Sequence, residues 1–328
     1  MNADALEIRA FRAGDETGIN DSFNLAHGTD RSLEAWSWRF PTSPEGRPII
    51  VARRGGRVVA HLAGVASRLE LNGRLINAAA VVDPFVLPET GGAAARAELA
   101  SLTTRAFVEE FGPGRRFDLV YRLQHGPADG GADGVFLGEE LAQPEAATLL
   151  RRRAGRAPWR RLAYRAEPAR DWEPRLDDLW RRARRSFPAA VVRDAGYALD
   201  RHAGHPTERR HRFVVLPRFG RRAVAFAVFD KRAGECRWLD LVWDHAHPGA
   251  LELLAHLSGR LAIQIGASCE RLLVGGDSEG RARLESLGFA LADEQPGTRL
   301  AVLACASAVD PAGPASRFYL TAADLEGR

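Results

Sequence analysis

The clearest pattern of hydrophobic and polar positions lies between residues 47 and 88. This stretch, RPIIVARRGGRVVAHLAGVASRLELNGRLINAAAVVDPFVLP, contains three apolar segments that are separated by Gly55-Gly56 and by Asn72-Gly73. Paired glycines and Asn-Gly favour the tight turns that connect neighbouring strands. The pattern therefore predicts an antiparallel meander of three strands.

Helical spacing is found on both sides of this meander. In the stretch SLEAWSWRF, Trp36 and Phe40 lie one helical turn apart, and Ser32 is a favourable N-cap. The earlier stretches LEIRAF and RAGDETGINDSFNLAHG predict a short strand and a first helix. After the meander, residues 93–110 predict a helix, and FDLVYRL predicts a buried strand.

The second half of the chain repeats this order of patterns. GRRAVAFAVFDKRAGECRWLDLVWDHAHP again predicts two strands around a glycine turn, followed by the helical stretch ALELLAHLSGRLAIQIG and the strand CERLLVGG. Arg201 and Pro206 have the same spacing as Arg39 and Pro44, at an offset of about 160 residues. We interpret the pattern as a tandem duplication, with one domain at 1–145, a linker at 146–175 and a degenerate second domain at 176–328.

The length and composition agree with two domains. A chain of 328 residues with 45% hydrophobic residues can bury a core in each half. No apolar stretch is long enough to span a bilayer, so we expect a cytoplasmic protein without a membrane partner. The three cysteines, Cys236, Cys269 and Cys305, are odd in number and widely spaced, which suits a reducing compartment better than a disulfide framework.

The charge balance argues against a nucleic-acid partner. The chain has 46 Lys and Arg against 42 Asp and Glu, a formal net charge of only +4. Arginine clusters such as Arg181 to Arg185 follow residues with helical spacing, and we interpret them as solvated helix faces. The net field is too weak for phosphate binding to dominate.

The order of these elements resembles the GNAT superfamily of N-acetyltransferases. The segments SLEAWSWRF, VDPFVLP, LDLVWD and RFYLTAADLE are similar to a bacterial tandem-GNAT subfamily, and Leu287-Gly288-Phe289 matches a later family motif. The resemblance implies an α/β (α+β) fold of two tandem GNAT-like lobes. Each lobe would be a mixed, mostly antiparallel sheet flanked by helices.

The resemblance also implies a function. It predicts an acyl-CoA-dependent N-acyltransferase that uses acetyl-CoA as cosubstrate, with the chemistry in the first lobe. The acceptor would be a small-molecule or peptide amine. The alternative is a catalytically silent tandem-GNAT protein that serves as a binding or assembly module.

The stretch VLPETGGAAAR falls where the family binds the cofactor pyrophosphate. A helix start offers unpaired amides and a positive dipole end, and glycines let the backbone approach a phosphate. The family pattern places Arg or Gln, Gly, and Gly or Ala where this chain has Glu89, Gly92 and Ala94, so the first position carries the opposite charge. A turn that no longer binds CoA is the alternative. The implied cofactor-binding residues are Val86, Leu87, Gly91, Gly92, Ala93, Ala94 and Arg96.

Three residues are candidates for the chemistry. Asp83 lies on the predicted fourth strand, where the superfamily often places a base, and Tyr121 and His125 end the fifth strand facing the same cleft. Each also has a structural alternative: a strand-end carboxylate, a half-buried aromatic ring and a loop position without a role. The tyrosine acid of many family members is replaced by Leu284 in the second half.

No metal site is expected. The histidines of the second half have spacings that fit no familiar ligand pattern. They are His202, His205, His211, His245 and His247. The turn DHAHPGALE, which corresponds to the pyrophosphate turn, is acidic and has one glycine, so we expect the second lobe to serve the fold only.

Overall fold

The first half of the chain forms most of one sheet. The computed structural model describes residues 5–124, 139–140, 147–155, 163–206, 208–293, 298–309 and 318–325. Five strands of this half lie side by side in the order β1 (Glu7–Ala10), β2 (Ile49–Arg54), β3 (Arg57–Leu71), β4 (Arg74–Val86) and β5 (Leu119–Gln124). β1 to β4 pair antiparallel, whereas β5 is parallel to β4. The predicted meander is confirmed as β2, β3 and β4.

The turns of the meander explain its sequence. Gly55, Gly56, Asn72 and Gly73 all have φ between 48° and 79°, in the left-handed region. Glycine adopts this region without strain, and asparagine tolerates it better than most residues do. The two turns therefore fix where β3 begins and ends.

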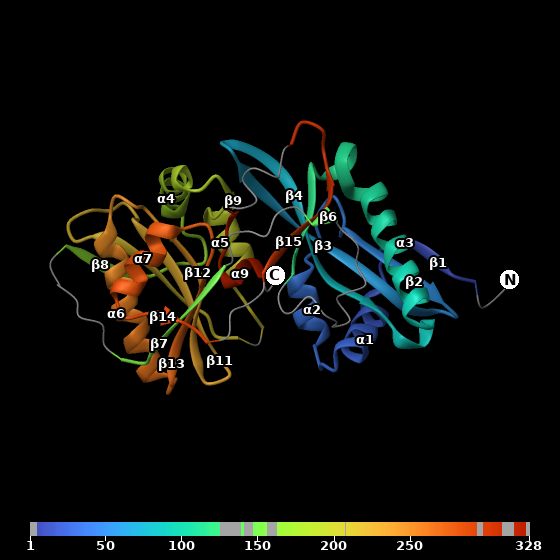
Figure 1. Cartoon of the computed structure of the whole chain (residues 1–328), viewed down its shortest axis with the longest axis horizontal. Coiled ribbons are helices and arrows are strands. Elements are labelled where there is room, and N and C mark those ends of the chain that lie inside the picture. Colours follow the sequence, from blue (N-terminus) through green and yellow to red (C-terminus); the bar gives the residue numbers. More distant parts are fainter. Residues whose placement is uncertain are drawn as a thin grey trace.

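Helices cover both faces of the first sheet (Figure 1). α1 (Glu16–His27) and α2 (Leu33–Arg39) pack on one face, where Trp36 is fully buried. α3 (Ala93–Phe111) packs on the other face through Phe107. Gly64 of β3 permits this contact, because a Cβ there would lie 2.7 Å from the Phe107 ring.

The second sheet has seven strands. Their order is β14 (Ala290–Leu291), β7 (Thr148–Arg153), β13 (Cys269–Val274), β12 (Glu235–Trp243), β11 (Ala225–Arg232), β10 (His211–Pro217) and β8 (Tyr164–Pro168). Its helices are α4 (Arg175–Ala183), α5 (Ala195–His202), α6 (Pro248–Gln264) and α7 (Ser278–Ser286). With two mixed sheets flanked by helices, the predicted fold class is confirmed.

The two halves exchange strands. β15 (Arg299–Cys305), from the end of the chain, pairs antiparallel with β5 and β6 (Glu139–Glu140) in the first sheet. Conversely, β7 pairs with β13 and β14 in the second sheet. The range 146–175, interpreted above as a linker, contains β7 and β8, and both strands belong to the second sheet. Periodicity predicts that a segment is a strand, but it does not say which sheet the strand joins.

A third group of strands connects the lobes. β9 (Ala189–Val191) pairs with β3, and β16 (Phe318–Tyr319) pairs with β9. A hydrophobic cluster fills this junction, with residues from both halves, among them Leu69, Tyr121, Leu149, Leu273 and Phe318. Short helical turns complete the structure: η1 (Pro88–Thr90), η2 (Gly112–Arg116), η4 (Arg184–Ser186) and α9 (Ala322–Leu325). Among the described helices, none combines the length and the apolar character needed to cross a bilayer.

Candidate functional site

The site is built around the divergence of β4 and β5. These parallel strands pair only through Ala78, Ala79 and Ala80, which lie opposite Leu119, Val120 and Tyr121. Beyond that point β4 continues to Val86 on its β3 side, while β5 pairs with β15. We call this divergence, between residues 81–86 and 122–124, the splay. No described strand pairs with the edge of β4 that faces it.

Asp83 occupies a bulge in β4 at the start of the splay. Its φ is +52°, and the register between β3 and β4 shifts between His61 and Ala63. The Asp83 carboxylate is nearly buried and forms ion pairs with Arg31 and with Arg39, whose Nη2 lies 2.7 Å from Oδ1. Burial raises the pKa of Asp83, but the charges of Arg39 and Arg31 outweigh it and lower the pKa below its ordinary value.

These contacts define what Asp83 can do. A carboxylate with a lowered pKa is a poor proton acceptor, and both of its oxygens already face guanidinium groups. The contacts instead tie the bulge of β4 to α2 and to the segment before it. The geometry therefore favours a positioning role over that of a general base.

His61 supports the bulge from β3. Its Nδ1 lies 2.9 Å from the carbonyl oxygen of Asp83, and its ring stacks on Phe85 at a centroid distance of 5.3 Å. Burial lowers the pKa of His61 to about 4, so the ring is neutral at pH 7. The sequence contains no signal for this residue, because a histidine inside an apolar strand matches no motif.

The predicted pyrophosphate turn forms the start of α3. Gly92 is the N-cap of this helix, and no side chain caps it. The first helical hydrogen bond runs from the Arg96 amide to the Gly92 carbonyl, at 3.1 Å. The amides of Ala93, Ala94 and Ala95 precede that bond, so they are the unpaired donors that a helix start presents to an anion.

The charged neighbours of the turn are already engaged. Glu89, which has the opposite charge to the family pattern, forms an exposed ion pair of 2.8 Å with Arg57. The Arg96 guanidinium folds back and donates to the Gly91 carbonyl at 2.9 Å. Val86 and Leu87 lead from β4 into the turn, and Leu87 is fully buried.

A cavity of about 800 Å³ opens beside the pairing of β4 and β5. Ala80 and Tyr121, the last residues paired before the splay, both line it. The other walls come from the end of α2 and residues 41–48, from residues 64–68 of β3, from residues 115–117 after α3, and from α5 and α9. The cavity therefore lies between the two halves of the chain.

Tyr121 faces this cavity from β5. Only 1% of the residue is exposed, and burial, with a contribution from Asp324, raises the pKa of its phenol to about 12. Tyr121 is therefore protonated at neutral pH, and its hydroxyl is available as a hydrogen-bond donor. Tyr121 lines this cavity, Asp83 is not among its lining residues, and His125 lies outside the described residues.

Several residues of the site come from the second half and were not predicted. Tyr197 and Arg201 of α5 and Asp324 of α9 line the same cavity as Tyr121. The segment RFYLTAADLE contains Asp324 and the repeat pairs Arg201 with Arg39, but neither pattern points to a site. None of the predicted cofactor-binding residues is among the cavity lining, so the turn and the cavity are separate parts of the candidate site.

The second lobe has a corresponding splay, and the C-terminal segment occupies it. β12 pairs with β13 only from Glu235 to Trp238. Beyond this point the Tyr319 hydroxyl donates to the Leu241 carbonyl at 2.6 Å, and Leu320 bridges Gly275. The chain itself therefore closes the second splay.

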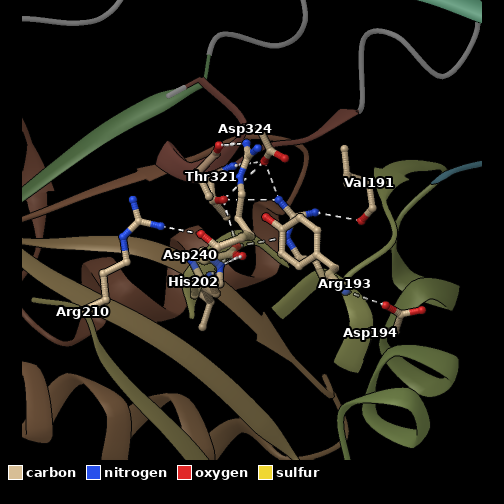
Figure 2. A network of polar contacts seen from close by, with 12 residues as sticks. Val191, Arg193, Asp194, His202, Arg210, Asp240, Thr321 and Asp324 are labelled. Carbon is tan, nitrogen blue, oxygen red and sulfur yellow. Dashed lines mark hydrogen bonds and ion pairs between the residues drawn. The ribbon is translucent and has the colours of Figure 1, made fainter. Parts of the chain in front are cut away.

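A buried ionic network holds this segment in place (Figure 2). Arg193 donates from Nε to Asp240 Oδ1 at 3.0 Å and also forms an ion pair with Asp324. Thr321 donates to the same oxygen of Asp240 at 3.0 Å, and His202 Nε2 lies 3.0 Å from the other oxygen. Burial lowers the pKa of His202 to about 4, so its ring is neutral.

The start of α6 is also covered. A Cβ on Gly249 would lie 2.7 Å from the Tyr164 ring, and the Tyr164 hydroxyl is 3.2 Å from Nδ1 of His247. The Tyr164 ring therefore covers the position at which a phosphate would approach the start of α6. The other histidines have local partners such as Glu208 and Asp277, and the described residues contain no cluster of metal-ligating side chains.

Solved structures with this arrangement come from several organisms. A probable N-acyltransferase from Enterococcus faecalis matches with a TM-score of 0.65 at 10% identity, covering 91% of this chain and 73% of that protein. A GCN5-related N-acetyltransferase from Anabaena variabilis matches with a TM-score of 0.65 at 12% identity, covering 90% and 72%. The N-myristoyltransferase of Saccharomyces cerevisiae, with bound myristoyl-CoA, matches with a TM-score of 0.58 at 12% identity, covering 90% and 82%.

These similarities define the class of fold. The chain has the fold of the GCN5-related N-acetyltransferases, as the resemblance predicted. No protein-family model matches the sequence, and no curated protein matches it. At 10% to 12% identity the comparison establishes the fold, and the chemistry has to be argued from the site.

Proposed function

We propose that the protein is an acyl-CoA-dependent N-acyltransferase whose chemistry takes place in the first lobe, with acetyl-CoA as the acyl donor and an amine as acceptor. One observation carries this proposal. The splay begins at Ala80 and Tyr121, which line the cavity, and β4 runs along it to Val86, from which the chain leads into the uncapped start of α3. A donor and an acceptor can therefore approach this point from two sides.

The parts of the site have separate roles in this proposal. The amides of Ala93 and Ala94 receive the donor's pyrophosphate, together with the positive end of the α3 dipole. The unpaired edge of β4 binds the pantetheine arm as an added strand would. These interactions position the thioester and leave the cavity for the acceptor.

The transfer itself requires two proton movements. The neutral amine attacks the thioester carbonyl, a C–N bond forms, the C–S bond breaks, and the CoA thiolate takes up a proton. We assign this donation to Tyr121, because it lines the cavity and is the last residue of β5 that pairs with β4 before the splay. The proton of the amine leaves through water in the cavity, and Asp83 acts by positioning Arg39.

The silent-module alternative rests on the departures from the family pattern. Glu89 replaces a basic or amide residue, and Leu284 replaces the family's tyrosine acid and is fully buried. However, the Glu89 charge is paired with Arg57, and Tyr121 offers a hydroxyl at the splay. These two observations favour an enzyme over a catalytically silent binding module.

Calorimetric titration with acetyl-CoA tests the proposal, with desulfo-CoA and ATP as comparison ligands. We expect one site per chain with micromolar affinity, because the second splay and the start of α6 are closed. Two sites per chain would contradict the assignment to the first lobe. No binding at millimolar acetyl-CoA would favour the silent module.

A further inference from the structure

The wall of the cavity includes an unpaired strand edge. β2 pairs with β3 as far as Ala63, and β9 pairs with the same edge of β3 from Leu69 onward. Between them, only the ends are engaged: the Gly64 amide donates to Pro48, and the Arg68 carbonyl accepts from Val192. All five residues of this gap, 64–68, line the cavity.

The backbone amide and carbonyl groups of a strand point to alternate edges, and those of Ala66 point to the open edge of β3. Gly64 and Arg68 bond toward this edge, and groups two residues apart along a strand point to the same side. The amide and carbonyl of Ala66 therefore point into the gap, away from β4. No described strand pairs with them, and the gap is about 16 Å long at the rise of an extended strand.

Arginine is the commonest charged residue in the cavity lining. Six arginines line the cavity against three carboxylates. Arg39, Arg47, Arg68 and Arg116 each form an ion pair with a carboxylate. Arg115 is exposed and forms no ion pair with a described residue. It lies after α3, and its neighbour Arg116 donates to the Glu45 and Gly46 carbonyls on the facing wall.

We propose that the acceptor is an acidic peptide, bound in extended form as an added strand on residues 64–68 of β3. This inference rests on the proposed acyl transfer. The peptide backbone would bond to Ala66 and its carboxylates would face the arginines. Its N-terminal residue would turn across the cavity, over β3 and β4, toward Ala80 and Tyr121, which line the same cavity. A guanidinium close to a bound amine lowers the pKa of the amine and so favours its reactive, neutral form.

Calorimetry with N-acetyl-Ala-Glu-Ala-Glu-Ala measures binding separately from transfer, because this peptide has no free N-terminal amine to acylate. The comparison peptide has lysine in place of both glutamates. We expect the acidic peptide to bind at least about tenfold more tightly. Arg115→Glu is expected to weaken its binding about tenfold, mainly through the charge. The matched control is Arg105→Glu, a reversal at an exposed position of α3 outside the cavity, which leaves binding unchanged.

Strand addition has its own test. Replacing the central peptide amide with an N-methyl amide removes a backbone donor without changing charge, and we expect binding to weaken about tenfold. On the protein side, Ala66→Pro removes an amide that is not used in the pairing with β4, so the fold is expected to persist. Equal affinity for the methylated and unmethylated peptides would overturn strand addition.

The outcomes separate this inference from the proposed function. If the protein binds acetyl-CoA but shows no saturable peptide binding, the peptide acceptor is ruled out and the proposed acyl transfer still stands. Turnover of glucosamine 6-phosphate in preference to the free-amine peptide also overturns the inference. If the protein binds no acetyl-CoA but binds the peptide, and Arg115→Glu weakens that binding, the peptide site is supported and the proposed acyl transfer is ruled out.

Discussion

Gly92 is the residue at which the cofactor proposal can be tested most directly. Its φ is −65°, and a Cβ there meets no atom within 4 Å, so a side chain fits without strain. Gly92→Glu places a negative charge beside the amides of Ala93 and Ala94. We expect the acetyl-CoA affinity to fall by at least about a hundredfold, as measured by calorimetry, through lost donors and charge repulsion.

Gly92→Ala is the matched control. It adds a side chain without a charge, and we expect it to keep most of the affinity. Gly91 is unsuitable for this purpose, because its φ is +136° and a Cβ would lie 3.0 Å from that of Ala95. If Gly92→Glu binds acetyl-CoA as the parent protein does, the pyrophosphate does not bind at this turn.

Asp83 can be tested for a positioning role against a role as base. Asp83→Asn leaves Arg31 and Arg39 without their carboxylate in a nearly buried place. We expect the free energy of unfolding to fall by about 3 kcal/mol in urea titrations. Glu89→Gln, which breaks an exposed pair, is expected to cost less than about 1 kcal/mol. Lost turnover at unchanged stability and unchanged acetyl-CoA affinity would instead identify Asp83 as the base.

The lowered pKa of His61 predicts how the stability of the protein depends on pH. Its pKa is about 4 in the folded protein and near 6.5 in an unfolded chain, so between these values only the unfolded chain binds the proton. Stability therefore falls as pH drops from 6.5 toward 4, by about 2 kcal/mol at pH 5.

The pH effect of His61 is measured as the difference in unfolding free energy between pH 7.5 and pH 5. His61→Gln cannot titrate and is expected to lose less stability over this interval than the parent protein does. His202, whose pKa is also about 4, continues to contribute in that variant. An identical loss in both proteins would show that His61 does not carry the effect.

At the scale of elements, the two splays differ because the C-terminal segment occupies the second one. Arg193 joins β12 to this segment and is 1% exposed in its side chain, between Asp240 and Asp324. Arg193→Met would leave both carboxylates buried without a cation. We expect a loss of about 3 to 5 kcal/mol in unfolding free energy from urea titrations.

Arg281→Met is the comparison for Arg193→Met. The Arg281 side chain is 48% exposed and pairs with Glu285 at the surface of α7, so its removal is expected to cost less than about 1 kcal/mol. A similar small loss for Arg193→Met would mean that the network does not hold the segment in place.

At the scale of the whole molecule, the exchanged strands connect the two halves. Each sheet contains a strand from the other half, β15 in the first and β7 in the second. Neither half can complete its sheet alone, so we expect a single cooperative unfolding transition. In differential scanning calorimetry the ratio of calorimetric to van't Hoff enthalpy should be near one. Two resolved transitions would show that the lobes unfold independently.

The sequence by itself determined the local elements and their order. Alternation and turn residues such as Gly55-Gly56 and Asn72-Gly73 predicted the meander, and helical spacing around Trp36 predicted α2. These patterns are local, because strand and helix periods are properties of neighbouring residues. The same reasoning placed the VLPETGGAAAR turn at the start of α3, where the structure has it.

Only the tertiary structure decided how the elements combine. The exchange of β7 and β15, the ion pairs of Asp83, and the entry of Tyr197, Arg201 and Asp324 into the cavity were not predictable. They join residues far apart in the chain, and strand pairing and burial depend on contacts that no local pattern encodes. For this reason the sequence predicted the turn before α3 and the strand that contains Tyr121, whereas the cavity between the halves required the fold.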